Sequence, residues 1–138
     1  MGCNELITGE GGNTMNFYKF DKENGKQISQ FNSDFIMSRV IQTNKPANIG
    51  CMYLEKNGVV GYHQATVPQL FLVVNGAGIV RNEKEEYIEI SSGDAVFWEK
   101  DEWHETKTDT GLMAIVIESE ELDPSSFMPS KESLSEEK

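Results

Sequence analysis

The sequence has few cysteines, few histidines and few basic residues, and it has no long apolar run. Its 138 residues include two Cys and two His, and 12 Lys or Arg stand against 23 Asp or Glu, for a formal net charge of −11. A surface this acidic repels phosphate backbones and anionic lipid headgroups, so we expect neither nucleic acid nor a membrane as a partner. No apolar stretch approaches the roughly 20 residues that a membrane-spanning helix needs.

The two cysteines do not suggest a disulfide framework. Cys3 lies in a Gly-rich stretch and Cys51 in an apolar run, and such different contexts are typical of free thiols in a reducing compartment. We therefore expect a cytoplasmic protein. The first residues have no basic region followed by an apolar stretch, so no signal peptide is expected. We interpret Cys51 as packing inside a strand rather than as a nucleophile.

Short apolar and β-branched runs recur along the chain between Gly, Asn and Asp residues. Two pairs, Asn57-Gly58 and Asn75-Gly76, have the composition of two-residue hairpin turns. No segment has the length and period of a crossover helix, so the sequence predicts an all-β, antiparallel sandwich or barrel. The expected strands are 34–42, 49–54, 59–63, 69–74, 78–81, 87–90, 95–98 and 112–117.

We expect one domain in three parts. Residues 1–14 are Gly-rich and without periodicity, which indicates a flexible segment, and residues 15–118 form the β-barrel. Residues 119–138 are acidic, Ser-rich and poor in apolar groups, which predicts a mobile tail. Phe127 and Met128, with Leu122, leave open that the first part of this tail packs on the barrel.

The two histidines lie at the ends of predicted strands. His63 shares a strand face with Ala65, and Gln69 shares a face of the next strand with Phe71. If these strands are antiparallel neighbours, His63 and Gln69 approach one another at the mouth of the barrel. His104 follows the charged loop 99–103, where it begins a further strand.

The positions of these residues resemble the first motif of the cupin superfamily of small jelly-roll barrels. That motif places a Gly, a His-x-His, a Glu and a second Gly in this order. Here Gly58 opens it, residues 63–65 stand at His-x-His, Gln69 stands at the Glu position and Gly76 closes it. The second motif of the family is matched by Gly93 and by His104. The resemblance covers about half of the chain and implies a double-stranded β-helix, or jelly-roll, fold.

The resemblance also implies a pocket, with departures that affect its chemistry. Metal-binding members use both His of the first motif, its Glu and the His of the second motif. Here Ala65 replaces a His and Gln69 replaces the Glu, which removes one imidazole and one negative charge. The expected metal ligands are thus His63, Gln69 and His104. The expected pocket adds Ala65, Phe71 and Trp103.

Three functions stay open on this sequence. The pocket can hold a metal weakly and serve a dioxygenase or isomerase of small organic or sugar-like substrates, use a His as acid or base without metal, or only bind a small molecule. We expect a small-molecule pocket with a weakly bound Ni, Zn, Fe or Mn ion, although a protein without metal also fits. Whether it is an enzyme is not decided. Members of this superfamily commonly pair, so we also expect a homodimer in which Phe17, Tyr18 and Phe20 supply a strand to the partner.

Overall fold

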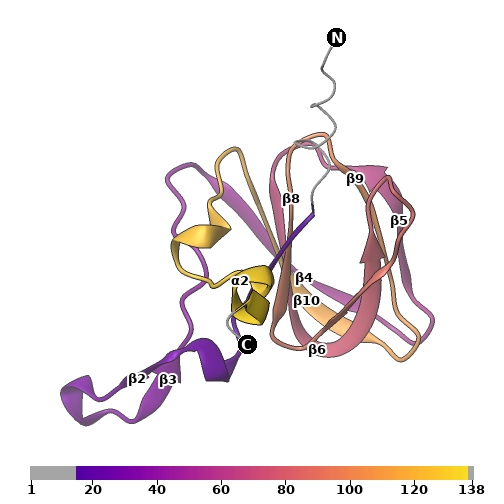
Figure 1. The fold of residues 1–138 in the computed structure, drawn as a ribbon. Helices are drawn as coiled ribbons and strands as arrows, with labels where there is room; N and C mark the ends of the chain where they lie inside the picture. Colours follow the sequence, from indigo (N-terminus) through magenta and orange to yellow (C-terminus); the bar gives the residue numbers. More distant parts are fainter. Residues whose placement is uncertain (1–14, 137–138) are drawn as a thin grey trace.

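Two β-sheets packed face to face make up most of the protein (Figure 1) in a computed structural model that describes residues 15–136. All strand pairs are antiparallel, and β6 belongs to both sheets. The all-β prediction and the jelly-roll prediction are confirmed. In order across the first sheet, the strands are β1 (Asn16–Lys19), β8 (Asp94–Trp98), β6 (Gln69–Arg81), β10 (Leu112–Ser119) and β4 (Ala47–Leu54). The second sheet contains β7 (Ile88–Ser91), the end of β6, β9 (Trp103–Lys107) and β5 (Val59–Gln64).

Asn75-Gly76 is not a hairpin turn, contrary to the sequence-based prediction. It lies inside β6, where the ladder with β10 shifts by one residue so that Val74 is left unpaired. Gly76 has φ +90°, and a Cβ at this position would collide with the carbonyl oxygen of Gly111. The pair thus supplies the bend by which one long strand passes from the first sheet to the second, since only Gly adopts this conformation without strain.

Asn57-Gly58 does form a turn, but the turn joins two sheets rather than two paired strands. The N–H of Gly58 donates to the carbonyl of Glu55 at 2.8 Å, and Asn57 has φ 64°. β4 then pairs with β10, whereas β5 pairs with β9. The hairpin prediction is therefore wrong, although the turn chemistry that suggested it is present.

Two further strand predictions differ from the structure. The strand expected at 34–42 is reduced to β3 (Phe35–Met37), which pairs with β2 (Lys26–Ile28) in a separate two-stranded sheet. This sheet extends away from the body of the protein (Figure 1), and Phe31 in its connection is 96% exposed. The strand expected at 49–54 is present as β4, but it is an edge strand on which Ile49 is 67% exposed. Cys51, which was expected to pack inside a strand, is exposed there.

The core has two layers because the first sheet is covered on both faces. Along β6, Phe71 and Val73 point between the sheets, while Leu70 and Leu72 pack on the outer face. The outer layer is covered by segments from both ends of the described chain. Each fully buried side chain of this size contributes roughly 1.5–3 kcal/mol. The outer cover is formed by Tyr18, Phe20, Val40, Ile41, Leu122 and Met128.

The segment that follows β10 packs against the body over part of its length. It contains η3 (Pro124–Ser126) and α2 (Lys131–Glu136). Met128 is buried in the outer core layer, the carbonyl of Pro129 accepts a hydrogen bond from the N–H of Lys19 at 3.0 Å, and Ser130 forms an isolated bridge with Tyr18. The structure thus differs from the mobile tail expected over 119–138, because apolar residues anchor its first part. The flexible segment expected at 1–14 lies outside the described residues.

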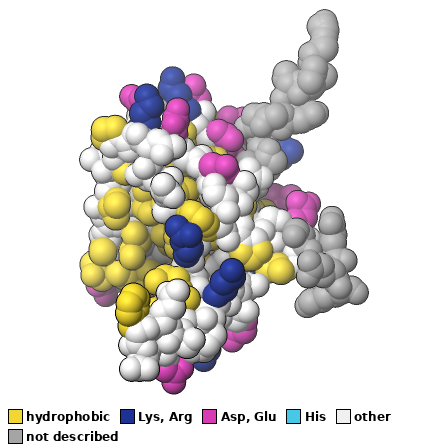
Figure 2. Space-filling view, turned by 90° about the vertical axis from the view of Figure 1, so that its left-hand side faces the viewer, with side chains coloured by type: hydrophobic (Ala, Val, Ile, Leu, Met, Phe, Trp, Pro, Cys, Tyr) yellow, Lys and Arg dark blue, Asp and Glu magenta, His cyan; other side chains and the backbone are white. Residues whose placement is uncertain are grey.

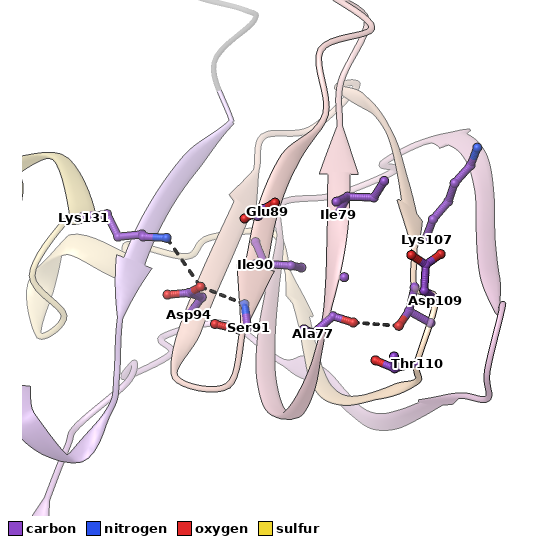
Figure 3. Close-up of a pocket in the computed structure, with 12 residues that line it drawn as sticks. Ala77, Ile79, Glu89, Ile90, Ser91, Asp94, Lys107, Asp109, Thr110 and Lys131 are labelled. Atoms are coloured by element: carbon purple, nitrogen blue, oxygen red, sulfur yellow. Dashed lines mark hydrogen bonds and ion pairs between the residues drawn. The ribbon is translucent and has the colours of Figure 1, made fainter.

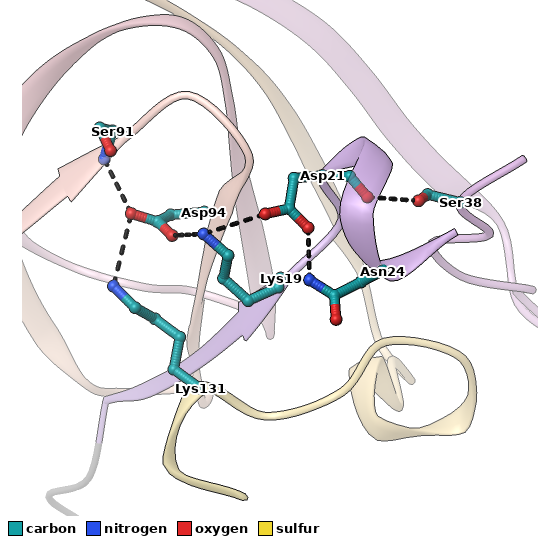
Figure 4. A network of polar contacts seen from close by, with 7 residues as sticks. All are labelled: Lys19, Asp21, Asn24, Ser38, Ser91, Asp94 and Lys131. Carbon is teal, nitrogen blue, oxygen red and sulfur yellow. Dashed lines mark hydrogen bonds and ion pairs between the residues drawn. The ribbon is translucent and has the colours of Figure 1, made fainter. Parts of the chain in front are cut away.

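A buried carboxylate ties the two ends of the described chain together (Figure 4). The side chain of Asp94 accepts from the ammonium of Lys19 at 2.9 Å, from that of Lys131 at 3.4 Å and from the N–H of Ser91 at 2.8 Å. Lys19 also contacts Asp21 at 3.3 Å. Because Asp94 is 3% exposed, its charge depends on these partners in place of water.

Replacement of Asp94 by Asn is expected to lower the free energy of unfolding by about 1–3 kcal/mol. The amide keeps an acceptor for Ser91, but it loses the charge that holds both lysines, which themselves stay in partial contact with water. Urea denaturation measures the change. As a matched control, Lys131→Ala removes only the more exposed pair and should cost less than about 1 kcal/mol; equal losses from both variants would contradict this account.

The homodimer stays a prediction, and β1, which was expected to supply a strand to the partner, lies at an edge of the first sheet. Phe17 and Tyr18 pair with Val96 and Ala95 of the same chain, as part of the ladder between β1 and β8. Apolar side chains do remain exposed elsewhere, and Figure 2 shows them gathered toward the left of one face with charged side chains dispersed around them. Light scattering at micromolar concentration should give the mass of two chains, and a monomer would contradict the prediction.

In the described part of the chain, no helix has the length and apolar character to cross a membrane.

Candidate functional site

A pocket of about 340 Å³ opens between the two sheets beside β4 and β5. Its walls combine aromatic and aliphatic side chains with a small number of polar groups, as small-molecule sites do. The first sheet contributes Asn48, Ile49, Gly50, Met52, Gln69, Phe71, Trp98, Val116 and Glu118, and the second contributes Val60, His63, His104 and Thr106.

A bulge in β5 directs His63 into this pocket. Val60 pairs with Thr106 and His63 with His104, so β5 uses three residue steps where β9 uses two. In a regular strand, residues three positions apart face opposite sides, and the bulge lets Val60 and His63 face the same side. Both residues line the pocket.

The two imidazoles lie against one another. The ring centres of His63 and His104 are 4.4 Å apart at an interplanar angle of 61°. His104 also stacks on Trp98, with centres 3.9 Å apart and planes 14° apart. Trp98 is fully buried on β8, so the stack fixes the ring of His104 on a rigid wall.

Each imidazole forms a hydrogen bond between its Nδ1 and a backbone carbonyl oxygen. Nδ1 of His63 lies 2.7 Å from the oxygen of Gly61, and Nδ1 of His104 lies 3.3 Å from that of Glu102. A carbonyl oxygen only accepts, so Nδ1 carries the proton and Nε2 keeps its lone pair in the neutral ring. This Nδ1–H contact to a carbonyl is the support that metal-binding histidines usually have.

His104 is held in the neutral form. Burial lowers the pKa of His104 to about 4, and the neighbouring His63 acts in the same direction against the hydrogen bond to Glu102. Its Nε2 is buried and has no hydrogen-bond partner in the part of the chain that the structure describes. The ring therefore presents an unused acceptor at neutral pH.

Gln69 reaches the same pocket, and a carboxylate stands beside it. Gln69 is 6% exposed, and its cross-strand neighbour on β10 is Glu118, which also lines the pocket. Glu118 escaped the sequence analysis because it follows the last predicted strand, 112–117, at the boundary with the acidic tail. Within residues 15–136, no three His, Cys, Asp or Glu side chains lie close enough together to hold a metal. The donor set thus fits a metal only through two imidazoles and the weak amide of Gln69.

The structure brings together His63, Gln69, Phe71 and His104 but not Ala65 or Trp103. Ala65 is buried. Its N–H donates a hydrogen bond to the carbonyl of Glu102, and its carbonyl accepts one from the N–H of Asp101, both in the loop before β9. Trp103 is 37% exposed and stacks on Tyr62 with ring centres 5.3 Å apart. Trp103 points away from the pocket because it alternates with His104 along β9.

Glu102 is a buried acid directly beside the site. It is 4% exposed, and its Oε1 accepts from the N–H of Glu99 at 3.0 Å. Its Oε2 is buried and has no hydrogen-bond partner within the described range 15–136. Burial raises the pKa of Glu102 to about 7, against the hydrogen bond from Glu99. Because its carbonyl contacts Nδ1 of His104, the loop that Glu102 closes also positions the imidazole.

A larger hollow of about 530 Å³ lies over the second half of β6, between β7 and β9 (Figure 3). Several of its polar groups are engaged with one another: Asp94 pairs with Lys131, and the hydroxyl of Thr108 donates to the carbonyl of Ala77 at 2.6 Å. The buried polar atoms without partners in the described residues belong to Trp98, Glu102 and His104, none of which lines this hollow. The pocket with the two histidines is therefore the better candidate for a functional site, because Trp98 and His104 in its walls carry such atoms.

Comparison with solved structures agrees with this architecture. A cupin superfamily protein from Desulfitobacterium hafniense is similar at a TM-score of 0.51 and 12% identity, over 58% of this chain and 72% of that one. A conserved protein of unknown function from Streptococcus pyogenes has the same TM-score and identity, over 58% of this chain and 68% of that one. The protein therefore has the cupin fold. No protein-family model matches the sequence, and no curated protein does so either.

Proposed function

We propose that the pocket between the sheets binds a small organic molecule, and that His63 and His104 can hold a divalent transition metal there weakly. The observation that carries the proposal is the pair of adjacent imidazoles whose Nδ1 atoms are both engaged with carbonyls. Each ring then offers Nε2, which is the atom that a ligand donor or a metal would use.

The affinity for metal is expected to be low. Two neutral imidazoles supply two donors, and the amide oxygen of Gln69 is a poor third because it has no charge. Ni²⁺ and Zn²⁺, which prefer imidazole, suit such a pair better than Mg²⁺ or Ca²⁺. A metal-dependent dioxygenase or isomerase would need the metal held more firmly than this donor set favours, so binding is the function that we propose first.

Metal titration of protein purified without a His-tag tests the metal part of the proposal. We expect calorimetry to show weak binding of Ni²⁺ or Zn²⁺ to the wild type and at least about tenfold weaker binding to His63→Ala. His63 is exposed, so this variant should fold. Trp103→Phe, which changes a residue outside the pocket, is the control and should bind as the wild type does. Equal binding by all three proteins would overturn the proposed metal site.

A further inference from the structure

Two residues that line this pocket each carry a buried polar atom without a partner among residues 15–136, and the two atoms have opposite hydrogen-bonding character. One is Nε1 of Trp98, which can only donate, and the other is Nε2 of His104. Nδ1 of His104 faces a carbonyl, so Nε2 is an acceptor. Both side chains are at least nine-tenths buried and both line the pocket. Buried polar atoms without partners are rare in native structures, and each one calls for a ligand or water.

The two side chains lie side by side, so one small molecule would meet both. The indole of Trp98 and the imidazole of His104 are stacked with their centres 3.9 Å apart. The ligand would therefore have to present an acceptor toward Trp98 and a donor toward His104 from neighbouring atoms. A carboxamide does so through its C=O and N–H, and a hydroxyl group does so through one oxygen. A carboxylate carries acceptors only.

The charge around the pocket also opposes an anion. Among the described residues that line it, none is Lys or Arg, and the one charged residue is Glu118, a carboxylate. The whole chain carries a formal charge of −11. An anionic ligand would be desolvated here without a cation to compensate it.

We propose that the pocket selects uncharged ligands that carry a hydrogen-bond donor beside an acceptor, such as carboxamides and alcohols, over carboxylates of the same shape. The inference rests on the proposed function, since it assigns a ligand class to the same pocket. The lining then has a role for each wall: the stacked Trp98 and His104 read the polar group, and Phe71 and Val116 contact the apolar remainder of the ligand.

Benzamide and benzoate are matched probes for this selectivity, because they share a ring and a planar head group and differ in charge and in the N–H donor. Binding is measured on the wild type at pH 7.5 with excess chelator, so that no metal anchors the carboxylate. The readout is the indole N–H resonance of Trp98 in ¹H–¹⁵N spectra, which Trp103→Phe distinguishes from that of the second tryptophan.

We expect benzamide to shift the Trp98 resonance in a saturable way and to bind about tenfold or more tightly than benzoate, since an acceptor that faces an acceptor leaves both unpaired. Benzoate binding as well as benzamide, or better, would overturn the selectivity and leave the small-molecule pocket standing. If neither probe moved the Trp98 resonance at millimolar concentration, both the selectivity and the proposed small-molecule function would be overturned.

Discussion

Glu102→Gln is expected to stabilise the protein progressively, relative to the wild type, as the pH rises from 4 to 8. The pKa of Glu102 is raised from 4.5 to about 7 by burial, so the folded state holds its proton where the unfolded state has lost it. Stability from this group is fully present below pH 4.5 and is lost as the pH rises through 7. Gln keeps the acceptor for the N–H of Glu99 but does not ionise. The displacement corresponds to on the order of 3 kcal/mol.

His104 gives the opposite dependence over nearly the same range. Its pKa is lowered from 6.5 to about 4, so the stability from its neutral form is present above pH 6.5 and is lost as the pH falls through 4. In the wild type, the opposite effects of Glu102 and His104 on the free energy of unfolding therefore nearly cancel between pH 4.5 and 6.5. His104→Gln should remove the gain in stability that His104 contributes as the pH rises. This variant should then lose stability steadily between pH 4.5 and 7, because only the contribution of Glu102 is left.

Urea denaturation at intervals of pH measures both effects. Gln64→Glu, on the exposed end of β5, is the control for a change of one charge, and its difference from the wild type should be small at every pH. A stability difference between Glu102→Gln and the wild type that is the same at pH 4 and pH 8 would show that Glu102 is ionised like an exposed carboxyl.

The sequence predicts the strands better than it predicts their connections. Runs such as 69–74 and 112–117 lie within β6 and β10 because burial on both sheet faces selects continuous apolar residues. Asn75-Gly76 misled because the same positive φ serves a hairpin turn or a bend within a long strand. Which of these occurs depends on pairing with β10 and with β7, and such distant partners are not visible in a local pattern.

The candidate site shows the same limit. His63, Gln69 and His104 were found because their spacing matches a motif, and the structure places them around one pocket. Glu118 could not be found in this way, because it lies 49 positions after Gln69 and becomes its neighbour only through the β6–β10 ladder. Trp103 was misplaced because an aromatic residue next to His104 in sequence lies on the opposite face of the strand.

Gln69→Glu is expected to convert the weak metal site into a firm one. The new carboxylate would stand beside Glu118 on the neighbouring strand, in the same pocket as His63 and His104. Two imidazoles and the one new carboxylate make a donor set that suits Zn²⁺, Mn²⁺ or Fe²⁺. Without metal, the two carboxylates repel each other, so we expect the variant to be less stable than the wild type.

Added metal should relieve that repulsion. The variant should therefore bind Zn²⁺ at least about 10–100-fold more tightly than the wild type does, because changes to residues that merely support a metal ligand already alter the affinity by this factor. Its melting temperature should therefore rise with Zn²⁺ by far more than that of the wild type. Gln64→Glu adds the same charge outside the pocket lining and should leave the affinity unchanged. An equal gain from both variants would mean that the acidity of the surface, rather than a shared site, attracts the ion. No gain from Gln69→Glu would mean that residue 69 and the two histidines do not converge on one ion.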